Sequence, residues 1–358
     1  MAGVAVTGIG LATALGSDRP TTWQRLLAGA ALAIAPAVTV PLPAADRPRV
    51  EQLALRVAQE ALADAGYDPP FGDWGLVVGS SRAYQADLEN LRRPGADLST
   101  FGRLGPGQLA STLARELGTS GPVHALSNAC ATGNWAIAQG TLLLAHHPRV
   151  LVVAAEAPIS PLTLAGFRQL GVLAKAQLRP LDRDRDGLVV AEGAAALVLE
   201  AQPGGYAQVL GWGCTADAVH PTRPTGDGIS LALHQCLRGA QITAAEVSLI
   251  QAHGTGTRLN DEREAAWIPT QFPQKPWLWA SKGATGHALG ATALIEAALA
   301  SLALHYGVIP PSPGTHHPIY EPFAQQAIAH PLSVVLNLSF GFGGQNAIVA
   351  LGHPHHFL

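Results

Sequence analysis

Short, continuously apolar segments alternate with segments of helical periodicity along this chain, and the alternation occurs twice. Residues 150–155 (VLVVAA) and 347–351 (AIVAL) are typical of the apolar runs. A strand that is apolar on both faces is buried between helices, so these runs predict parallel sheets covered on both sides. Because residues 1–204 and 205–358 repeat the pattern, we expect two halves of one internally duplicated α/β/α/β/α five-layer sandwich.

The charge and the hydropathy of the chain argue against nucleic acid and membranes as partners. The net charge of −3 gives no electrostatic footprint for nucleic acid. Residues 1–16 lack the basic segment of a secretory signal and are interrupted by glycines. The most apolar later run, residues 291–304, carries Glu296 and ends at His305, so it is expected to be too short to span a bilayer. We therefore expect a soluble cytoplasmic protein that binds neither nucleic acid nor membrane.

The cysteine and acidic patterns give no sign of a metal or a disulfide framework. The chain has three cysteines, Cys130, Cys214 and Cys236, with no C-x-x-C pair, which fits a reducing compartment. The segment DRDRD (182–186) resembles the start of a calcium loop, but Gly193 stands where the closing carboxylate would be. We expect a salt-bridged turn there and no metal site.

The glycines of VTGIG (6–10) give only a weak hint of dinucleotide binding. They follow an apolar run, but Thr13 replaces the third glycine and no acidic residue closes a second strand at the expected distance. A tight turn from a strand into a helix is the favoured interpretation.

The stretch HALSNACATGNWAIAQGTLLL (124–144) places Cys130 where a strand turns into a helix. The positive end of a helix favours a thiolate, which is the nucleophilic form of cysteine. Small neighbours leave room for a substrate or a second chain. Taken alone, Cys130 is better explained as a buried structural cysteine.

Four segments are rich in glycine and small polar residues, and each lies at or just after a predicted strand. They are SNACATG (127–133), HGTGTRLND (253–261), SKGATGHALG (281–290) and NLSFGFGGQN (337–346). Together they would supply a thiol, imidazoles, a cation and free backbone N–H groups, which is what thiol-based acyl transfer needs.

These segments resemble the signature of the β-ketoacyl synthases, the condensing enzymes of the thiolase superfamily. The resemblance runs from VTGIG (6–10) to GFGGQNAIVAL (341–351) and includes residues 179–200 and 215–224. The Cys-His-His set is similar to that of the elongating type. The resemblance implies a thiolase-like sandwich in which the half 1–204 carries the cysteine and the half 205–358 carries both histidines and the glycine-rich gate loop.

The resemblance also implies roles for five residues. Cys130 would receive an acyl chain as a thioester, and the backbone N–H groups of Cys130 and Phe342 would form an oxyanion hole. His253 and His287 would stabilise the enolate that forms as malonyl thioester loses CO₂. Lys282 would tune the charge of the histidine cluster, and the Phe342 side chain would act as a gate for the acyl chain.

Three further residues carry supporting roles with simpler alternatives. Glu296 matches a family carboxylate that steadies the histidine network, but it could be only a carboxylate on a helix face. Thr255 and Thr257 would contact a pantetheine arm, but they could instead cap a helix that begins near Asp261.

The implied partner is an acyl carrier protein, whose phosphopantetheine arrives with the substrate, so no cofactor of the chain's own is expected. Basic residues that could meet an acidic carrier are Arg168, Arg179, Arg183 and Arg185. A homodimer is expected, and a heterodimer with another ketosynthase is the alternative. Two other functions stay open: a chain-length-factor-like partner subunit, and a thioester acyltransferase or decarboxylase.

The chain is shorter than a typical elongating synthase. The losses fall near residues 35–50, 80–108 and 260–278, which in the family build the cap over the site, part of the dimer surface and a wall of the acyl pocket. Within HGTGTRLND, Arg258 and Asn260 stand where the family often has proline and glycine.

Overall fold

The computed structural model describes residues 3–32, 37–43, 45–105, 107–217, 219 and 226–354. Each half contributes five strands to the main sheet. Those of the first half are β1 (Val4–Ala12), β3 (Gly75–Gly79), β4 (Val123–Leu126), β5 (Arg149–Glu156) and β7 (Gly193–Glu200). Those of the second half are β8 (Ala207–Ala216), β9 (Val247–Gln251), β10 (Trp277–Trp279), β13 (Val334–Gly341) and β14 (Gln345–Gly352).

Within the described residues these strands form one sheet in the order β10-β9-β13-β14-β8-β1-β7-β5-β3-β4. The halves join where β1 and β8 pair over a short antiparallel stretch, from Val4 opposite Val209 to Val6 opposite Ala207. Counted outward from this join, each half presents its first, fifth, fourth, second and third strand. The identical order is the sign of an internal duplication, as the sequence predicts.

The predicted strand direction is only partly right. β3 runs parallel to β4 and β5, and β9 runs parallel to β10 and β13. The strands between them are antiparallel: β5 with β7, β7 with β1, and β13 with β14. An apolar run shows that both faces of a strand are covered, but it does not determine the direction of the neighbouring strand. The sheet is therefore mixed rather than parallel.

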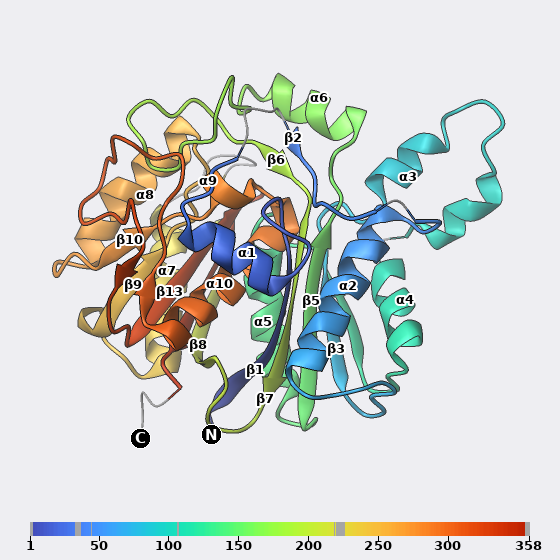
Figure 1. The fold of residues 1–358 in the computed structure, drawn as a ribbon, viewed down its shortest axis with the longest axis horizontal. Coiled ribbons are helices and arrows are strands. Elements are labelled where there is room, and N and C mark those ends of the chain that lie inside the picture. Colours follow the sequence, from blue (N-terminus) through green and yellow to red (C-terminus); the bar gives the residue numbers. More distant parts are fainter. Residues whose placement is uncertain are drawn as a thin grey trace.

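Two helices lie between the halves and produce the five layers. α5 (Thr132–Leu143) contacts β3 and β5 of the first half and β8 and β14 of the second, and α10 (Thr292–Tyr306) likewise contacts strands of both halves. α2 (Arg49–Asp64) and α4 (Gln108–Leu117) cover the outer face of the first half. α7 (Gly226–Ala240) and α8 (Arg258–Gln271) pack on the second half. Figure 1 shows α5 and α10 in the middle of the molecule.

The expectation that the apolar segment 291–304 is too short to span a bilayer is wrong by length, because the central helix α10 continues directly from a 3-10 turn. With the 3-10 turn η3 (Leu289–Ala291) it forms an apolar stretch of 18 residues, Leu289–Tyr306, which has the length and composition to cross a membrane. However, 89% of this stretch is buried inside the protein. A helix that is apolar on all sides and covered by two half-sheets is a core helix.

Gly8 and Gly10 lie inside β1 rather than in a turn. A Cβ atom at Gly8 would come 2.1 Å from the carbonyl oxygen of Ala61, and one at Gly10 would come 1.9 Å from that of Val57. Both carbonyls belong to α2. The glycines therefore allow close packing of α2 on the sheet, and the predicted strand-to-helix turn is wrong.

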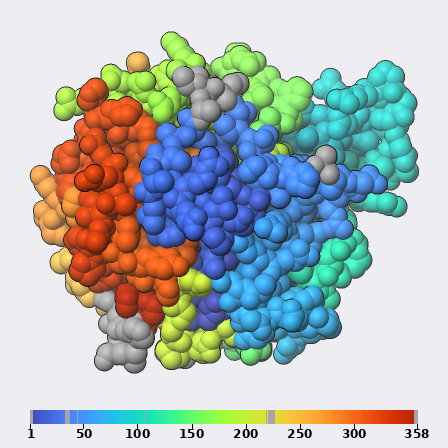
Figure 2. All heavy atoms as spheres, viewed as in Figure 1, coloured from blue at the N-terminus to red at the C-terminus, as the bar shows by residue number. Residues whose placement is uncertain are grey.

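Shorter elements complete the described chain. They are α1 (Arg19–Leu27), β2 (Ala37–Val38), α3 (Gln85–Asn90), η1 (Leu98–Arg103), α6 (Pro161–Gln169), β6 (Val190–Ala191), η2 (Ala244–Glu246), α9 (Lys282–Thr285), β11 (Val308–Ile309) and β12 (Ile328–Ala329). The segment with α3 and η1, cyan in Figures 1 and 2, projects from the body as a lobe.

Candidate active site

Cys130 lies in a tight turn between the edge strand β4 and the central helix α5. Ala129 has a positive φ of 49°, which is uncommon for a residue with a side chain. The Thr132 hydroxyl accepts from the Asn128 N–H at 2.8 Å and donates to the Ala129 carbonyl at 2.6 Å. The Ser339 hydroxyl donates to the Cys130 carbonyl at 2.9 Å. These bonds fix the backbone of the turn and do not involve the half-buried thiol.

The thiol differs from the sequence-based expectation of a thiolate. Burial raises the pKa of Cys130 to about 11, although the Lys282 charge and the Phe342 backbone N–H both lower it. Desolvation disfavours the charged form of the sulfur more than these groups favour it. The resting nucleophile is therefore a neutral thiol, and its proton must pass to a base when it reacts. The Phe342 N–H donates to the Cys130 sulfur, so this backbone donor lies next to the nucleophile.

His253 follows β9, and its backbone is fixed by a buried carboxylate. Glu264 of α8 accepts from the His253 N–H at 2.6 Å and from the Gly254 N–H at 2.9 Å. The His253 ring meets the His287 ring edge-on with 5.7 Å between centroids, and it also contacts Phe340. Its Nδ1 atom is buried without a hydrogen-bond partner among the described residues.

His287 is oriented through its own Nδ1 atom. Nδ1 accepts from the Leu289 N–H at 3.2 Å and lies 3.0 Å from the Thr292 hydroxyl. Because Nδ1 accepts a backbone N–H, the hydrogen-bond network assigns the proton to Nε2. Burial, followed by the charge of Lys282, lowers the pKa of both His253 and His287 well below the ordinary value. Both imidazoles are neutral at physiological pH.

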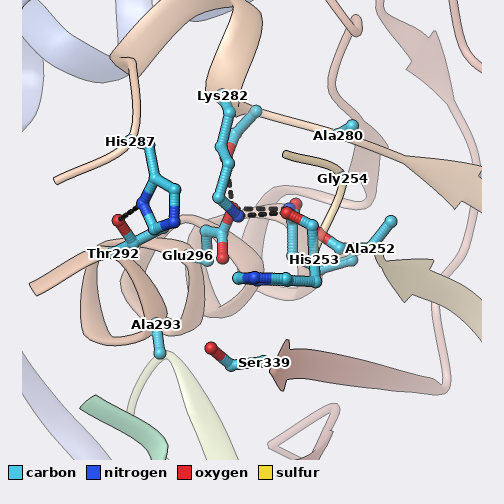
Figure 3. Close-up of polar contacts among 12 residues, drawn as sticks. Ala252, His253, Gly254, Ala280, Lys282, His287, Thr292, Ala293, Glu296 and Ser339 are labelled. Atoms are coloured by element: carbon cyan, nitrogen blue, oxygen red, sulfur yellow. Dashed lines mark hydrogen bonds and ion pairs between the residues drawn. The ribbon is translucent and has the colours of Figure 1, made fainter. Parts of the chain in front are cut away.

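Figure 3 draws a buried ion pair, Lys282 with Glu296, between the two histidines. The Lys282 ammonium lies 2.7 Å from Glu296, both side chains are fully buried, and the ammonium also donates to the His253 carbonyl. The Ser281 hydroxyl and the Gln251 amide each donate to the same Glu296 oxygen at 3.2 Å. Glu296 is therefore part of the histidine network and not a solvent-facing helix carboxylate.

Thr255 and Thr257 lie side by side with 2.8 Å between their hydroxyls. Thr257 occupies the N-cap position of α8, but its side chain makes no capping hydrogen bond. The Thr255 hydroxyl donates to Asp261 at 3.3 Å, and Asp261 also accepts from the Leu181 N–H at 2.7 Å. The side-chain capping alternative is wrong.

One cavity of about 570 Å³ joins these groups. It is lined by Cys130, His253, His287, Thr255, Thr257 and Phe342, with neighbours that include Phe167, Leu170, Lys175 and Arg258. Phe342 is 38% exposed, and its ring stacks on Phe167 with 6.4 Å between centroids. Gly343 and Gly344 follow it with φ of 83° and 73°, which gives the loop the freedom of a hinge. The cavity thus connects a thiol, two neutral imidazoles and the glycine-rich loop that carries Phe342.

Family models match most of the chain. The N-terminal domain of beta-ketoacyl synthase matches residues 43–203, and the C-terminal domain of beta-ketoacyl synthase matches residues 206–316. The chain belongs to the beta-ketoacyl synthase family. It is similar to 3-oxoacyl-[acyl-carrier-protein] synthase 2 of Rhizobium meliloti, with 31% identity over 97% of this chain and 98% of the relative.

Two further similarities concern polyketide systems. The ketoacyl synthase alpha subunit of the tetracenomycin polyketide synthase from Streptomyces glaucescens is 32% identical over 88% of this chain and 83% of its own. The solved structure described as the ishigamide ketosynthase/chain length factor superposes with a TM-score of 0.90, at 29% identity and 98% coverage of both chains. The fold is thus the thiolase-like fold of ketosynthases.

This chain is shorter than the Rhizobium meliloti synthase over the region that they share. The alignment with the Rhizobium meliloti synthase spans 416 positions, whereas this beta-ketoacyl synthase has 358 residues, so the relative contains segments that this chain lacks. Of the family-like segment 215–224, residues 218 and 220–224 lie outside the described residues.

Sequence reasoning missed the carboxylates that support the synthase site. Glu264 fixes the backbone at His253, and the buried Glu156 accepts from the Ser81 hydroxyl at 2.6 Å and the Gly290 N–H at 3.2 Å. Glu264 had one signal, since it lies three residues after Asp261 in the same helix and so on the same face. Nothing in the sequence around Glu156 indicates its role.

The predicted basic docking set is partly wrong. Arg185 is buried and donates to the carbonyls of Asp182 and Arg258 at 2.8 and 2.9 Å, so it cannot meet a partner. Arg179 is half-buried, whereas Arg168 and Arg183 are exposed.

The DRDRD segment is a turn, but backbone hydrogen bonds rather than Asp–Arg salt bridges form it. Asp182 accepts from the backbone N–H groups of Asp184, His316 and His317 at 2.6 to 2.8 Å. His317 lies 3.1 Å from the Asp184 carboxylate. No Asp–Arg ion pair occurs within residues 182–186, all of which are described.

Proposed function

We propose that this protein catalyses the decarboxylative Claisen condensation of an acyl thioester with malonyl-acyl carrier protein, giving 3-oxoacyl-acyl carrier protein in fatty-acid or polyketide-type synthesis. The observation that carries the proposal is the single cavity in which a thiol faces two neutral, fixed imidazoles. The names of the relatives, a 3-oxoacyl-[acyl-carrier-protein] synthase and a polyketide ketoacyl synthase, support it.

The first half-reaction loads the acyl group. The Cys130 sulfur attacks the thioester carbonyl, a new carbon–sulfur bond forms, and the carrier's phosphopantetheine leaves as a thiol. That thiol takes up the proton that Cys130 lost, with a neutral histidine as the intermediate base. The backbone N–H groups of Cys130 and Phe342 stabilise the oxyanion of the tetrahedral intermediate.

The second half-reaction forms the new carbon–carbon bond. The bond between the malonyl methylene and its carboxylate breaks, CO₂ leaves, and the electron pair becomes an enolate whose oxygen accepts from His253 and His287. Its carbon attacks the Cys130 thioester, and the Cys130 thiolate leaves and is protonated from solvent. Neutral imidazoles suit this step because they donate hydrogen bonds to a developing charge without surrendering a proton. The ion pair of Lys282 and Glu296 holds this arrangement.

The partner that follows from this reaction is an acyl carrier protein, with Thr255 and Thr257 beside the pantetheine arm. Lys175 and Arg258 line the cavity, and Arg168 and Arg183 are exposed, so these basic residues could meet an acidic carrier. We also propose that the protein is cytoplasmic. We propose that it forms a homodimer, with a heterodimer with a second ketosynthase as the alternative. The ketosynthase/chain length factor relative makes the heterodimer worth testing.

One assay tests the proposal against its rivals. The purified protein is mixed with an acyl-carrier thioester and malonyl-carrier protein, and both acyl-Cys130 and 3-oxoacyl product are measured by mass spectrometry. Product formation is the expected result. Acylation without product would support a transferase instead, and activity only in the presence of a second synthase would support a partner subunit.

A further inference from the structure

The turn formed by residues 80–83 lies beside the nucleophile turn. Gly79, at the end of β3, pairs with Leu126 of β4, and the Ser80 N–H donates to the Leu126 carbonyl at 3.1 Å. A Cβ atom at Gly79 would come 2.6 Å from the Thr132 methyl in the first turn of α5. Arg82 and Cys130 therefore leave neighbouring strand ends at the same edge of the sheet.

The backbone of this turn is fixed by the buried carboxylate of Glu156. One oxygen accepts from the Ser81 hydroxyl and backbone N–H and from the Gly290 N–H, and the other accepts from the Arg82 N–H at 3.2 Å. Ala83 has a positive φ of 44°, a conformation that persists only when its surroundings enforce it. The position of the Arg82 backbone is thus determined, and only its side chain is free.

The Arg82 side chain is exposed, and its guanidinium makes no hydrogen bond or ion pair with any residue that the structure describes. The Glu156 carboxylate beside it is already occupied by its four donors. The turn that carries Arg82 is adjacent to the nucleophile turn, and the Arg82 charge is the smallest of the contributions that act on the pKa of the Cys130 thiol. An unpaired guanidinium near a reacting sulfur can bind a carboxylate in a bidentate geometry.

Arg82 also lies outside the set of residues that line the cavity with Thr255, Thr257 and Phe342. With a pantetheine arm in this cavity, the acyl group on Cys130 would extend toward the adjacent turn of residues 80–83. We infer that Arg82 selects the acyl group on Cys130 by pairing with an anionic group at its far end, so that the preferred acyl donor is the half-thioester of a dicarboxylic acid. This inference rests on the proposed function in taking Cys130 as the acyl carrier.

Acyl-pantetheine probes of matched carbon number test the inference. The pairs are succinyl with butyryl, glutaryl with pentanoyl, and adipyl with hexanoyl, which differ only in a terminal carboxylate or methyl group. In each case the Cys130 sulfur displaces pantetheine, which leaves as a thiol with the Cys130 proton. The rate of acylation is followed by intact-protein mass spectrometry, with the site verified by peptide mapping.

We expect the wild-type protein to prefer the carboxylate-bearing probe of at least one pair by about tenfold or more, as a charge-assisted hydrogen bond provides. Arg82→Met and Arg82→Gln should abolish the preference, and Arg82→Lys should retain part of it. Arg92→Met is the control, because Arg92 is an exposed arginine of the neighbouring lobe, and it should leave the preference unchanged.

Three outcomes would overturn the inference. Equal or faster acylation by the methyl-ended probes at all lengths would do so, as would a preference that survives in both Arg82→Met and Arg82→Gln. A defect of Arg82→Met confined to the KM for malonyl-carrier protein would assign Arg82 to the malonyl carboxylate instead. Failure of the proposed function gives a different result. Selective acylation without 3-oxoacyl product refutes the proposed condensation but leaves the inference about Arg82 intact. No acylation by any probe refutes both the proposed function and the inference.

Discussion

Two turns occupy equivalent places in the duplicated fold and carry different parts of the chemistry. β4 and β10 are the outer strands of the two halves, and each leads into one of the two central helices. After β4 the chain makes a short turn and presents Cys130 at the start of α5. After β10 it inserts α9 and η3 and delivers Lys282 and His287 before α10 begins.

The two turns differ in how much their side chains are constrained. The thiol of Cys130 is half-buried, and apart from the Phe342 N–H nothing described is hydrogen-bonded to its sulfur. Lys282 and His287 are buried. The ion pair of Lys282 with Glu296 and the hydrogen bond from the Leu289 N–H to His287 hold their side chains in place. A nucleophile must move from thiol to thioester and back, whereas groups that stabilise a developing charge act best when they are preorganised. The duplication thus separates a reactive turn from a rigid one.

The largest expected effect comes from removing the reactive group alone. Cys130→Ala should reduce condensation by at least about a thousandfold, because no other group can form the acyl-enzyme. Malonyl-carrier protein should still lose CO₂ slowly, because the enolate site is intact. Product analysis by mass spectrometry separates the two reactions. Cys214→Ala is the control and should leave condensation unchanged; residual condensation in Cys130→Ala would mean that another nucleophile carries the chain.

Breaking the rigid turn should cost stability as well as activity. Lys282→Met leaves the Glu296 carboxylate buried without its cation, which typically costs about 3–5 kcal/mol of unfolding free energy. The double variant Lys282→Met/Glu296→Gln removes both charges and should recover most of that loss, but not the rate of malonyl decarboxylation. Denaturant unfolding measures the first effect and CO₂ release the second. Lys275→Met, at an exposed position, serves as the control.

These two turns also show how far the sequence alone leads. The glycine-rich segments after apolar runs predicted that Cys130, His253, Lys282 and His287 meet, because strand ends gather at one edge of a sheet. The sequence could not determine the pKa of Cys130, since that depends on burial by segments far away in the chain. Nor could it distinguish Glu264 from the other acidic residues of α8, because which carboxylate turns inward depends on the packing of that helix.

The two turns should respond differently to pH. The thiol pKa of about 11 means that the thiolate fraction grows with pH, so alkylation of Cys130 by iodoacetamide should rise about tenfold per pH unit between about pH 7 and 9. The pKa values of His253 and His287 are lowered, so the imidazoles stay neutral until pH falls through those lowered values. The imidazoles themselves should therefore cause no change in malonyl decarboxylation near pH 6.5, whereas Glu264 and Glu296, whose pKa values burial raises to about 7, take up protons as pH falls through that value.

Peptide mapping is needed for this measurement, because Cys214 and Cys236 are further thiols whose pKa values burial raises. An alkylation rate that levels off below about pH 8 would show that Cys130 is already a thiolate. An NMR titration in which either histidine ring gains a proton near pH 6.5 would show that the histidines titrate like exposed imidazoles.

The smallest expected effect tests how precisely the reactive turn must be placed. Gly341, at the end of β13, lies against the nucleophile turn: a Cβ atom there would be 3.0 Å from the Asn128 carbonyl oxygen and 3.1 Å from the Cys130 nitrogen. Gly341→Ala should therefore push the turn by a few tenths of an ångström and slow acylation of Cys130 by about tenfold, since small misplacements of reacting groups are costly. Stability should change little, because the neighbouring Phe342 loop can yield. Gly102→Ala, in the lobe where a Cβ atom meets nothing within 4 Å, is the matched control. If Cys130 of the Gly341→Ala variant is acylated at the wild-type rate, the reactive turn tolerates displacement. The two turns would then differ in the groups they carry and not in how precisely those groups must be placed.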